Sequence, residues 1–467
     1  MTQLDTYHMM VISQYLPSIK YFVSIELVCK KYNGNMVKFH NNPISLNQKT
    51  IKYFSNIETL NIYNRYDETF GNDVFKTTKK TNTADKINFF KINVWCEVSY
   101  DEYKTQTNTN ISYKNINYKL KDYEKYGQII PKNVKKLGTR CLTKYKKQSI
   151  TIPNSVNLLE DNCFSNCTSL QFVTLPSYLQ CIENGCFYCA FYLKEINIPD
   201  TVTKIGENCF ECCYSLSSIK LPKALLCLPN NLCERCTNLQ SVTNPTTVDT
   251  VGFKCFDGCS MQSVQILNCK YRLCAFAFSN CKLLKSVTMT GNLDEIRCYC
   301  FSNCELLVSV SLPDCVTLFG DHCFNQCKSL EFIKLPEKLN EIQVGCFGGC
   351  INLKRIEIGS KLYAIGSCCF RGCHNLEDLI LPNGLVLIGE KSFFDCINLK
   401  TIILPESLKQ IKDECFGGCT TLEITVPSTL VLIGKNAFSN CKSVIYQKKK
   451  TSKQESNPVR IAECCRP

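Results

Sequence analysis

Residues 381–405 read LPNGLVLIGEKSFFDCINLKTIILP, and residues 198–222 read IPDTVTKIGENCFECCYSLSSIKLP. Both follow one frame, LPxxLxxIGxxCFxxCxxLxxIxLP. An earlier unit begins at Ile130 with Leu142 in the phenylalanine place, so the sequence predicts about fourteen units from Ile130 to Cys441. The step between units is 23 residues and shortens to 22 at two points, with Cys233 filling one gap; the phenylalanines lie at positions 164, 187, 210, 256, 278, 301, 324, 347, 370, 393, 416 and 438.

A period of 23 residues is typical of leucine-rich repeats. The LxxIxL part predicts a short strand, and Pro222 ends one such strand because proline has no N–H to continue a ladder. The IGxxCFxxC part is expected to return the chain as a turn and a short helix or 3₁₀ segment. No unit can bury its own apolar side, so neighbours must stack. The predicted fold class is a curved α/β-type repeat solenoid with a helical cap at residues 1–48.

The frame resembles the BspA-like, or Treponema-type, leucine-rich repeat family. The resemblance covers residues 130–441, and the FxxCxxLxxIxLP core recurs throughout them. It implies protein binding and association with a surface or membrane, without catalytic activity. The sequence also favours the absence of catalytic activity. Its hydroxyl groups have no accompanying histidine, and the GG pairs lie within FGGC rather than before a lysine. We therefore expect a non-enzymatic chain with no cofactor and no metal.

The 36 cysteines are mainly part of the repeat. Ladder positions in a solenoid are interior, and free cysteine behaves as a small buried hydrophobe, so these thiols are predicted to fill the core. Zinc binding through CxxC spacing and disulfides between turns stay open as alternatives. One ladder precedes the phenylalanine, at 163, 186, 209, 255, 300, 323, 346, 369 and 415; the other follows it, at 167, 213, 236, 259, 281, 304, 327, 350, 373, 396, 419 and 441.

The two ends of the chain give expectations about location. The N-terminus shows no secretory signal, and no run of 18 apolar residues occurs, which favours the cytoplasm or the cytoplasmic face of the plasma membrane. Residues 442–467 form a basic tail that ends in Cys464 and Cys465. Cys464 occupies the place of a prenylated cysteine, and a lipid beside a basic run provides two membrane-binding signals. The alternative is a disordered tail with two spare thiols.

The N-terminal part has two interpretations. Residues 1–48 look helical, and residues 16–32, LPSIKYFVSIELVCKKY, resemble an F-box, which recruits a ubiquitin-ligase adaptor. The interpretation that we favour is a cap for the solenoid, which repeat arrays need. Residues 49–129 are predicted to hold a degenerate repeat, FSNIETLNI, a polar insertion, and strand character in INFFKINVWCEV.

The net charge of +13 is concentrated in two segments. Residues 114–147 carry eleven basic and two acidic residues, and residues 442–467 carry seven and two. Contact with an anionic membrane surface, or a solvated cap, is the expected role. Nucleic acid is not an expected partner because no RNA-binding motif accompanies the charge.

The candidate binding surface lies on the predicted strands, whose outward side chains are expected to face the concave side. In the middle of the array these side chains are small and polar, whereas the C-terminal third mixes aromatic, charged and aliphatic groups that typically anchor interfaces. The expected partner is a protein ligand; a plain spacer and a surface adhesin are the alternatives. The candidate residues are Phe332, Lys334, Arg355, Glu357, Asp378, Ile380 and Ile403.

Overall fold

The computed structural model describes residues 4–75, 86–143, 145–243, 248–266 and 269–448. The chain divides into two compact units. The N-terminal unit comprises Met1–Cys141 and Pro153–Leu159, and the repeat unit comprises Leu142–Ile152 and Glu160–Pro467. The division after Cys141 falls inside the first repeat that the sequence predicts from Ile130.

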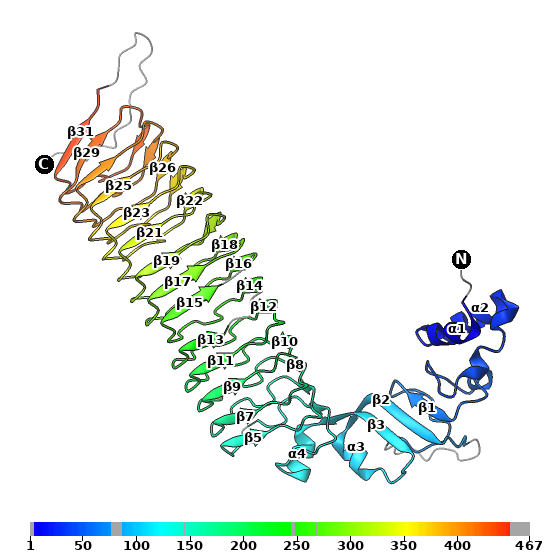
Figure 1. Ribbon diagram of the computed structural model, residues 1–467. Coiled ribbons are helices and arrows are strands. Elements are labelled where there is room, and N and C mark those ends of the chain that lie inside the picture. The colour runs from blue at the N-terminus through cyan, green and yellow to red at the C-terminus, as the bar shows by residue number, and fades with distance from the viewer. Residues whose placement is uncertain (1–3, 76–85, 144, 244–247, 267–268, 449–467) are drawn as a thin grey trace. The chain divides into compact units, whose positions relative to one another are not determined.

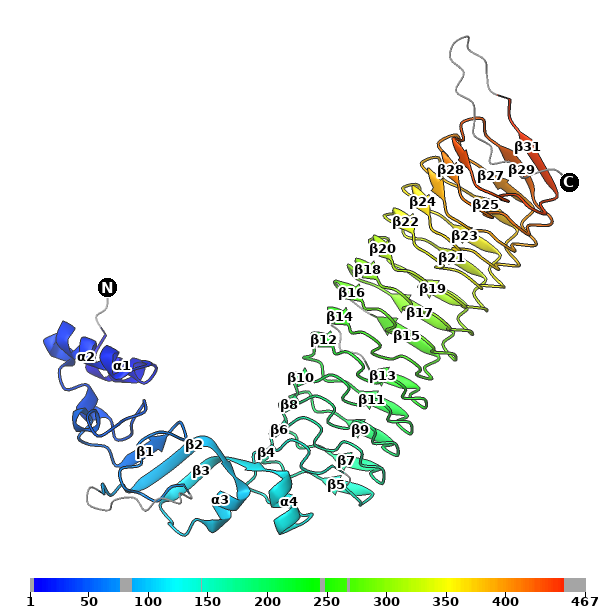
Figure 2. The same cartoon turned by 180° about the vertical axis from the view of Figure 1, so that it is seen from behind.

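The repeat unit is a parallel-strand solenoid, which confirms the predicted fold class (Figures 1 and 2). The strands predicted from LxxIxL form its first ladder, in which consecutive strands lie 22 or 23 residues apart, except for a last step of 20 residues from β29 to β31, and pair in parallel where they are hydrogen-bonded. The first ladder contains β5 (Ser149–Thr151), β7 (Phe172–Thr174), β9 (Glu195–Asn197), β11 (Ser218–Lys220), β13 (Ser241–Thr243), β15 (Ser263–Ile266), β17 (Ser286–Met289), β19 (Ser309–Ser311), β21 (Phe332–Lys334), β23 (Arg355–Glu357), β25 (Asp378–Ile380), β27 (Thr401–Ile403), β29 (Glu423–Val426) and β31 (Ser443–Tyr446).

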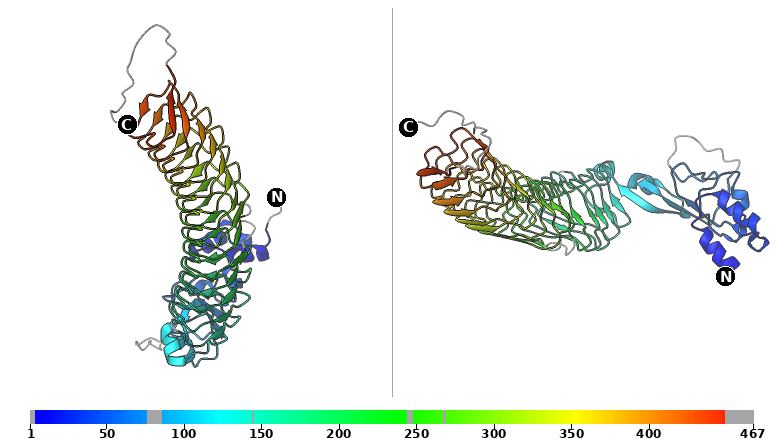
Figure 3. Two further views of the ribbon diagram at one scale, coloured as in Figure 1. Left: turned by 90° about the vertical axis from the view of Figure 1, so that its left-hand side faces the viewer. Right: turned by 90° about the horizontal axis from the view of Figure 1, so that it is seen from above.

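A second ladder of two-residue strands runs along the opposite side of the turns (Figure 1). The sequence analysis did not predict it, because two residues show no alternation of their own. It contains β8 (Cys181–Ile182), β10 (Lys204–Ile205), β12 (Cys227–Leu228), β14 (Thr250–Val251), β16 (Arg272–Leu273), β18 (Glu295–Ile296), β20 (Leu318–Phe319), β22 (Glu341–Ile342), β24 (Ala364–Ile365), β26 (Leu387–Ile388), β28 (Gln410–Ile411) and β30 (Leu432–Ile433). The turns follow one another in a single stack (Figure 3).

The core of each turn is built from the conserved frame of the repeat. The middle residue of a three-residue strand faces inward, as Ile219 and Ile333 do, while the flanking residues face solvent. The phenylalanines stack face to face, with ring centroids 5.1 to 5.7 Å apart in successive turns. Identical side chains in one slot therefore form a continuous apolar column whose burial from water stabilises the stack.

The cysteines of both ladders are buried, as predicted, apart from half-buried Cys441 at the end of the array. The second ladder also has a polar role that the sequence analysis missed. Each of its thiols donates a hydrogen bond of 3.0 to 3.3 Å to a backbone carbonyl of the preceding turn. In most turns this carbonyl belongs to the phenylalanine, as in Cys327 to Phe301. The thiol thus fills space and provides a donor to a buried acceptor.

The return segment of each turn differs from the expectation of a short helix. In the described repeats the CFxxC segment is a series of turns with two left-handed residues, one before the first cysteine and one before the second. Asn208 has φ +56°, and Gly349 has φ +73°. Left-handed residues interrupt helical hydrogen bonding, and asparagine and glycine tolerate this conformation best. The second glycine of FGGC, such as Gly349, therefore allows the left-handed backbone conformation at its position.

The N-terminal unit is irregular and contains five parallel strands in the order β1, β2, β3, β4, β6. Phe22, Phe39 and Phe54 form a buried trio with edge-to-face contacts. Residues 1–48 are partly helical, and β2 matches the predicted strand character. The elements are α1 (Thr6–Ser13), α2 (Ile19–Val28), the 3₁₀ segments Lys30–Tyr32, Met36–Lys38 and Ile51–Tyr53, β1 (Thr59–Ile62), β2 (Lys91–Ser99), α3 (Tyr100–Thr105), β3 (Ile111–Tyr118), α4 (Leu120–Tyr126), β4 (Lys136–Leu137) and β6 (Leu158–Leu159).

Candidate protein-binding surface

The seven candidate residues all lie on the outward side of the first ladder, in β21, β23, β25 and β27. Register places Phe332 beside Arg355 and Lys334 beside Glu357, and it places Ile380 beside Ile403. The alternation of a β-strand explains this, since residues two apart point to the same face. The seven residues and Thr401 thus form two parallel rows, which we call the C-terminal strand patch.

Arg355 organises the charged part of this patch. Its guanidinium lies 2.8 Å from Glu357 Oε1, and its central carbon lies 5.9 Å from the ring centroid of Phe332. Asp378 accepts a hydrogen bond of 2.8 Å from the Thr401 hydroxyl. Arginine over an aromatic ring and beside a carboxylate is a common anchor at interfaces. These partner atoms could not be foreseen from the repeat pattern, which fixes only the slots.

A groove of about 500 Å³ lies over the patch and is lined by five of the seven candidates. Phe332 and Ile403 do not line it. The other five lining residues are the middle residue of β23 and residues that follow β21 and β23, none of which was a sequence-based candidate; they are Leu335, Glu337, Ile356, Ile358 and Gly359. Glu337 and Gly359 follow the strands in the LP part of the frame, so attention to that part would have found them.

Two isoleucines give the patch an exposed apolar centre. Ile380 is 80% exposed and Ile403 is 73% exposed, although they are strand neighbours. Removing such side chains from water is favourable by about 1.5–3 kcal/mol each when burial is complete. The same outward row continues to Thr425 and to Ile445, which is 60% exposed. This part of the ladder therefore presents a row of exposed aliphatic side chains.

A second hollow of about 520 Å³ lies on the same ladder near its start. It is lined by β7, β9, β11 and β13, where Phe172 occupies the slot that Phe332 occupies in β21. Lys194 Nζ lies 5.4 Å from the ring centroid of Phe172. The other outward lining residues are mostly polar, among them Glu195, Asn197 and Ser241. This region was not among the sequence-based candidates.

The N-terminal unit has its own exposed apolar side chains, on the segment that resembles an F-box. Leu27 and Val28 at the end of α2 are 81% and 83% exposed, and Tyr15 after α1 is 84% exposed. A separate hollow of about 430 Å³ is lined partly by Leu16 and Pro17 of the same segment. Leu27, Val28 and Tyr15 are more exposed than we would expect if this segment only packed against the rest of its unit.

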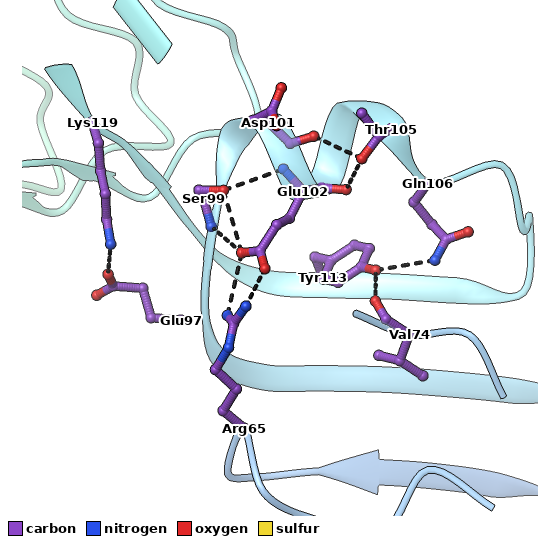
Figure 4. Close-up of polar contacts among 10 residues, drawn as sticks. All are labelled: Arg65, Val74, Glu97, Ser99, Asp101, Glu102, Thr105, Gln106, Tyr113 and Lys119. Carbon is purple, nitrogen blue, oxygen red and sulfur yellow. Dashed lines mark hydrogen bonds and ion pairs between the residues drawn. The ribbon is translucent and has the colours of Figure 1, made fainter. Parts of the chain in front are cut away.

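The basic segment at residues 114–147 is partly neutralised by its own unit. Lys119 and Lys136 lie 3.1 and 3.0 Å from the two carboxylate oxygens of Glu97 on β2, and Lys125 forms an ion pair with Asp101 (Figure 4 shows Lys119, Glu97 and Asp101). Burial alone would raise the pKa of Glu97, but hydrogen bonds from Lys136, Asn117 and Lys119 outweigh it and leave that pKa below its usual value. Pairing reduces the charge available to an anionic partner.

The neighbouring polar cluster stabilises the fold around α3 (Figure 4). Ser99 and Glu102 form a capping box, and Glu102 also pairs with Arg65. Burial would raise the pKa of Glu102, but the hydrogen bonds from Arg65 and Ser99 lower it below its usual value. The Tyr113 hydroxyl donates to the Val74 carbonyl. Each of these polar groups contacts another protein group, which accounts for the cluster without a ligand.

The other sequence-based candidates are the lipidation cysteines and a zinc site. Cys464 and Cys465 lie outside the described residues. Within the described ranges, no three metal-ligating side chains come together. The helices in the described part of the chain are all too short or too polar to cross a membrane.

The two ladders, the 23-residue turns and the outward variable rows define a leucine-rich repeat protein. The family model for the BspA type leucine rich repeat region (6 copies) matches residues 135–262, 249–377 and 364–455, which is more than half of the chain. The chain therefore belongs to the BspA-type leucine-rich repeat family, as its sequence frame predicted.

Solved structures and curated proteins were compared as well. A leucine-rich repeat protein from Bacteroides ovatus is 28% identical, with a TM-score of 0.44, over 57% of this chain and 82% of that one. A leucine rich cell surface protein from Faecalibacterium prausnitzii is 24% identical, with a TM-score of 0.39, over 68% and 84%. The leucine rich repeat protein of T. pallidum is 25% identical, with a TM-score of 0.26, over 40% and 72%. No curated protein matches the chain.

Proposed function

We propose that this protein is a non-catalytic scaffold that binds a protein ligand through the C-terminal strand patch. The observation that carries the proposal is the groove of about 500 Å³ beside two neighbouring isoleucines that are 80% and 73% exposed. Membership of a repeat family fits a scaffold, because solenoids present extended surfaces to partners.

The chemistry of the patch supports a protein partner over a small molecule. Arg355, Glu357 and Asp378 place both signs of charge beside Ile380 and Ile403, all on a broad strand face. Interfaces combine apolar anchors with a polar rim in this way. The ligand expected here has a protruding apolar side chain for the isoleucines and charged groups around it.

Affinity capture with the whole chain tests this role. We expect Arg355→Glu combined with Ile380→Asp to abolish recovery of a protein that the unchanged chain captures. Thr288→Asp is the matched control, because Thr288 faces outward from β17 in the slot of Lys334, two turns before it, and does not line the groove. Equal recovery with the double variant and the control would contradict the proposal.

We also propose that the scaffold acts inside the cell, tethered to the cytoplasmic membrane face by lipid on Cys464 and Cys465. The basic residues of the tail support this, since a polybasic run strengthens a lipid anchor at an anionic leaflet. Cell fractionation compares the chain with Cys464→Ser/Cys465→Ser; unchanged membrane recovery would refute the tether. A surface adhesin is the competing role, and its exposed thiols would react with an impermeant thiol reagent on intact cells.

A second candidate function is an F-box-like adaptor of a ubiquitin ligase. The exposure of Leu27 and Val28 favours it, because an adaptor would cover these side chains. A pull-down should lose the ligase adaptor on Leu27→Asp/Val28→Asp, while Tyr66→Asp, at a still more exposed aromatic of the same unit, should retain it. If neither version recovers an adaptor, the segment serves the fold of its own unit.

A further inference from the structure

We propose that Cys189 and Cys212 form a reversible disulfide that links two successive turns of the solenoid when a small-molecule disulfide is present. The proposal concerns a modification site and is independent of the ligand-binding role proposed above. Both thiols are free in the structure.

The two cysteines occupy the same slot in adjacent turns. Each precedes the second cysteine position of its repeat, and the residues are 23 positions apart. The Cys189 N–H donates to the Glu211 carbonyl at 2.9 Å, and the Cys212 N–H donates to the Glu234 carbonyl at 2.8 Å, so each turn is bonded to the next at this slot. Adjacent hydrogen-bonded strands lie about 4.8 Å apart, within the 4.4–6.8 Å between Cα atoms that a disulfide spans.

Their backbones also point the two side chains in the same direction. Cys189 has φ +56° and Cys212 has φ +60°, both in the left-handed region. Other turns fill this slot mainly with asparagine or glycine, which tolerate that conformation better, so two cysteines here go against backbone preference. Bond formation requires the two Cβ atoms to approach to about 3.5–4.5 Å, which a small side-chain rotation and shift provide.

The surroundings distinguish this pair from the other thiols. Cys189 is half-buried, and Cys212 is 6% exposed, so a reagent reaches the pair through Cys189. Ladder thiols such as Cys186, Cys209 and Cys213 are fully buried. Outside the two buried ladders, no other cysteines in the described ranges share one slot of successive turns. Accessibility and proximity therefore coincide at this pair.

Tyrosine side chains contact both thiols. A hydrogen bond between Tyr188 and Cys189 is the main reason that the pKa of Tyr188 rises to about 12. A hydrogen bond to Cys212 likewise raises the pKa of Tyr214. Burial raises the pKa of Cys189, while the hydrogen bond from Tyr188 opposes this effect. Little thiolate is present at neutral pH, so the exchange should accelerate as pH rises toward 9.

The reaction with oxidised glutathione balances in two steps. The Cys189 thiolate attacks one sulfur of the reagent, which forms a mixed disulfide and releases one glutathione thiolate. The Cys212 thiolate then attacks the Cys189 sulfur, which forms the protein disulfide and releases the second glutathione. The protein loses two protons and two electrons, and the reagent is reduced to two molecules of glutathione.

Peptide mapping of the folded full-length chain under non-reducing conditions tests the proposal. After treatment with oxidised glutathione at pH 8.5 we expect a cross-linked peptide pair that contains Cys189 and Cys212, the loss of two free thiols, and a higher Tm that dithiothreitol reverses. Cys212→Ser should instead accumulate glutathione on Cys189. Cys181→Ser, which removes another half-buried thiol, is the control and should still form the cross-link.

Two results would overturn the proposal. One is a wild-type chain that carries glutathione on Cys189 while Cys212 stays free, since resolution then fails. The other is a wild-type chain in which both thiols remain free after the same treatment, while a denatured sample reacts.

Discussion

The two units of this protein pack aromatic rings in opposite ways. In the repeat unit, the phenylalanines of the CFxxC frame lie nearly parallel to one another, as Phe324 and Phe347 do with an interplanar angle of 2°, although Phe319 meets Phe324 edge to face at 68°. In the N-terminal unit, Phe22, Phe39 and Phe54 meet edge to face at 66–73°. Edge-to-face contact is favourable for isolated ring pairs. In the column of frame phenylalanines, translation from one turn to the next places each ring parallel to its neighbour, whereas Phe253 and Phe276 share another slot of successive turns and meet at 75°.

The difference shows how each unit obtains stability. The repeat unit uses the same few contacts in every turn, so the contribution of a residue depends on whether it has a neighbour on both sides. The N-terminal unit uses each contact once and adds partly buried ion pairs such as Lys136 with Glu97. Four measurements test whether the two units differ in this way.

The largest effect is expected for Phe324→Ala. Its ring is fully buried and stacks on Phe301 and Phe347, so loss of the ring should lower the free energy of unfolding by about 3–5 kcal/mol. Urea denaturation gives the value. Phe438→Ala is the matched control, because Phe438 is half-buried and has only Phe416 as a stacking neighbour in the described turns. An equal loss for both variants would show that neighbours on two sides do not matter.

A smaller effect is expected for Cys327→Ala, which removes a fully buried thiol and its hydrogen bond to the Phe301 carbonyl. The free energy of unfolding should fall by about 1–3 kcal/mol because a buried acceptor loses its donor and a small void is left. Cys227→Ala, at an exposed position, should change stability little. If the two alanine variants are equally stable, the thiol hydrogen bond contributes nothing.

Acid should distinguish the two units through Glu97. Its folded pKa is below the usual value, so the stabilisation by its partners is present above the unfolded pKa of about 4.5 and is lost as pH falls through the folded pKa. The N-terminal unit of Glu97→Gln should be less stable at pH 7 than the unchanged unit, and the difference should shrink as pH falls below about 4.5. Hydrogen exchange of β2 and β3 at several pH values follows this; a constant difference down to pH 3 contradicts the assignment.

The smallest effect is expected for Lys354→Ala. Lys354 pairs with Glu331 at 3.0 Å on the repeat unit, but both side chains are more than half exposed, at 56% and 57%. Such pairs contribute about 0–1 kcal/mol. The midpoint of urea unfolding should therefore barely move and should be insensitive to salt. A loss above that range would place the surface ion pairs of the turns among the main stabilising contacts.

Much of the repeat unit could be predicted, because a 23-residue period fixes which side chains share a slot. The buried cysteines and the two outward rows, one with Phe332 and the other with Ile380, follow from it. The second ladder and the left-handed residues could not be predicted from the period, since they depend on backbone hydrogen bonds between turns. In the candidate site, the pairing of Arg355 with Glu357 depends on rotamers, which a repeat pattern does not specify.

The N-terminal unit shows which elements could not be predicted from sequence patterns. Strand β2 was recognisable from its apolar residues, whereas α3, β3 and α4 lie in a stretch that looks polar. Their positions depend on single contacts, such as Glu102 with Ser99 and Arg65. A contact that occurs once leaves no period in the sequence.

The uniform step between turns has a consequence for how the length of this protein can change. Loss or gain of one whole turn rejoins equivalent slots; after loss of the turn that holds Phe324, for example, Phe301 would stack on Phe347 as it now stacks on Phe324. Such a change between β13 and β21 would move the hollow at Phe172 and the groove at Arg355 closer together or further apart by one strand spacing, about 4.8 Å. The length of the array can therefore change only in whole turns. The number of turns between the two surface hollows determines how far apart they lie.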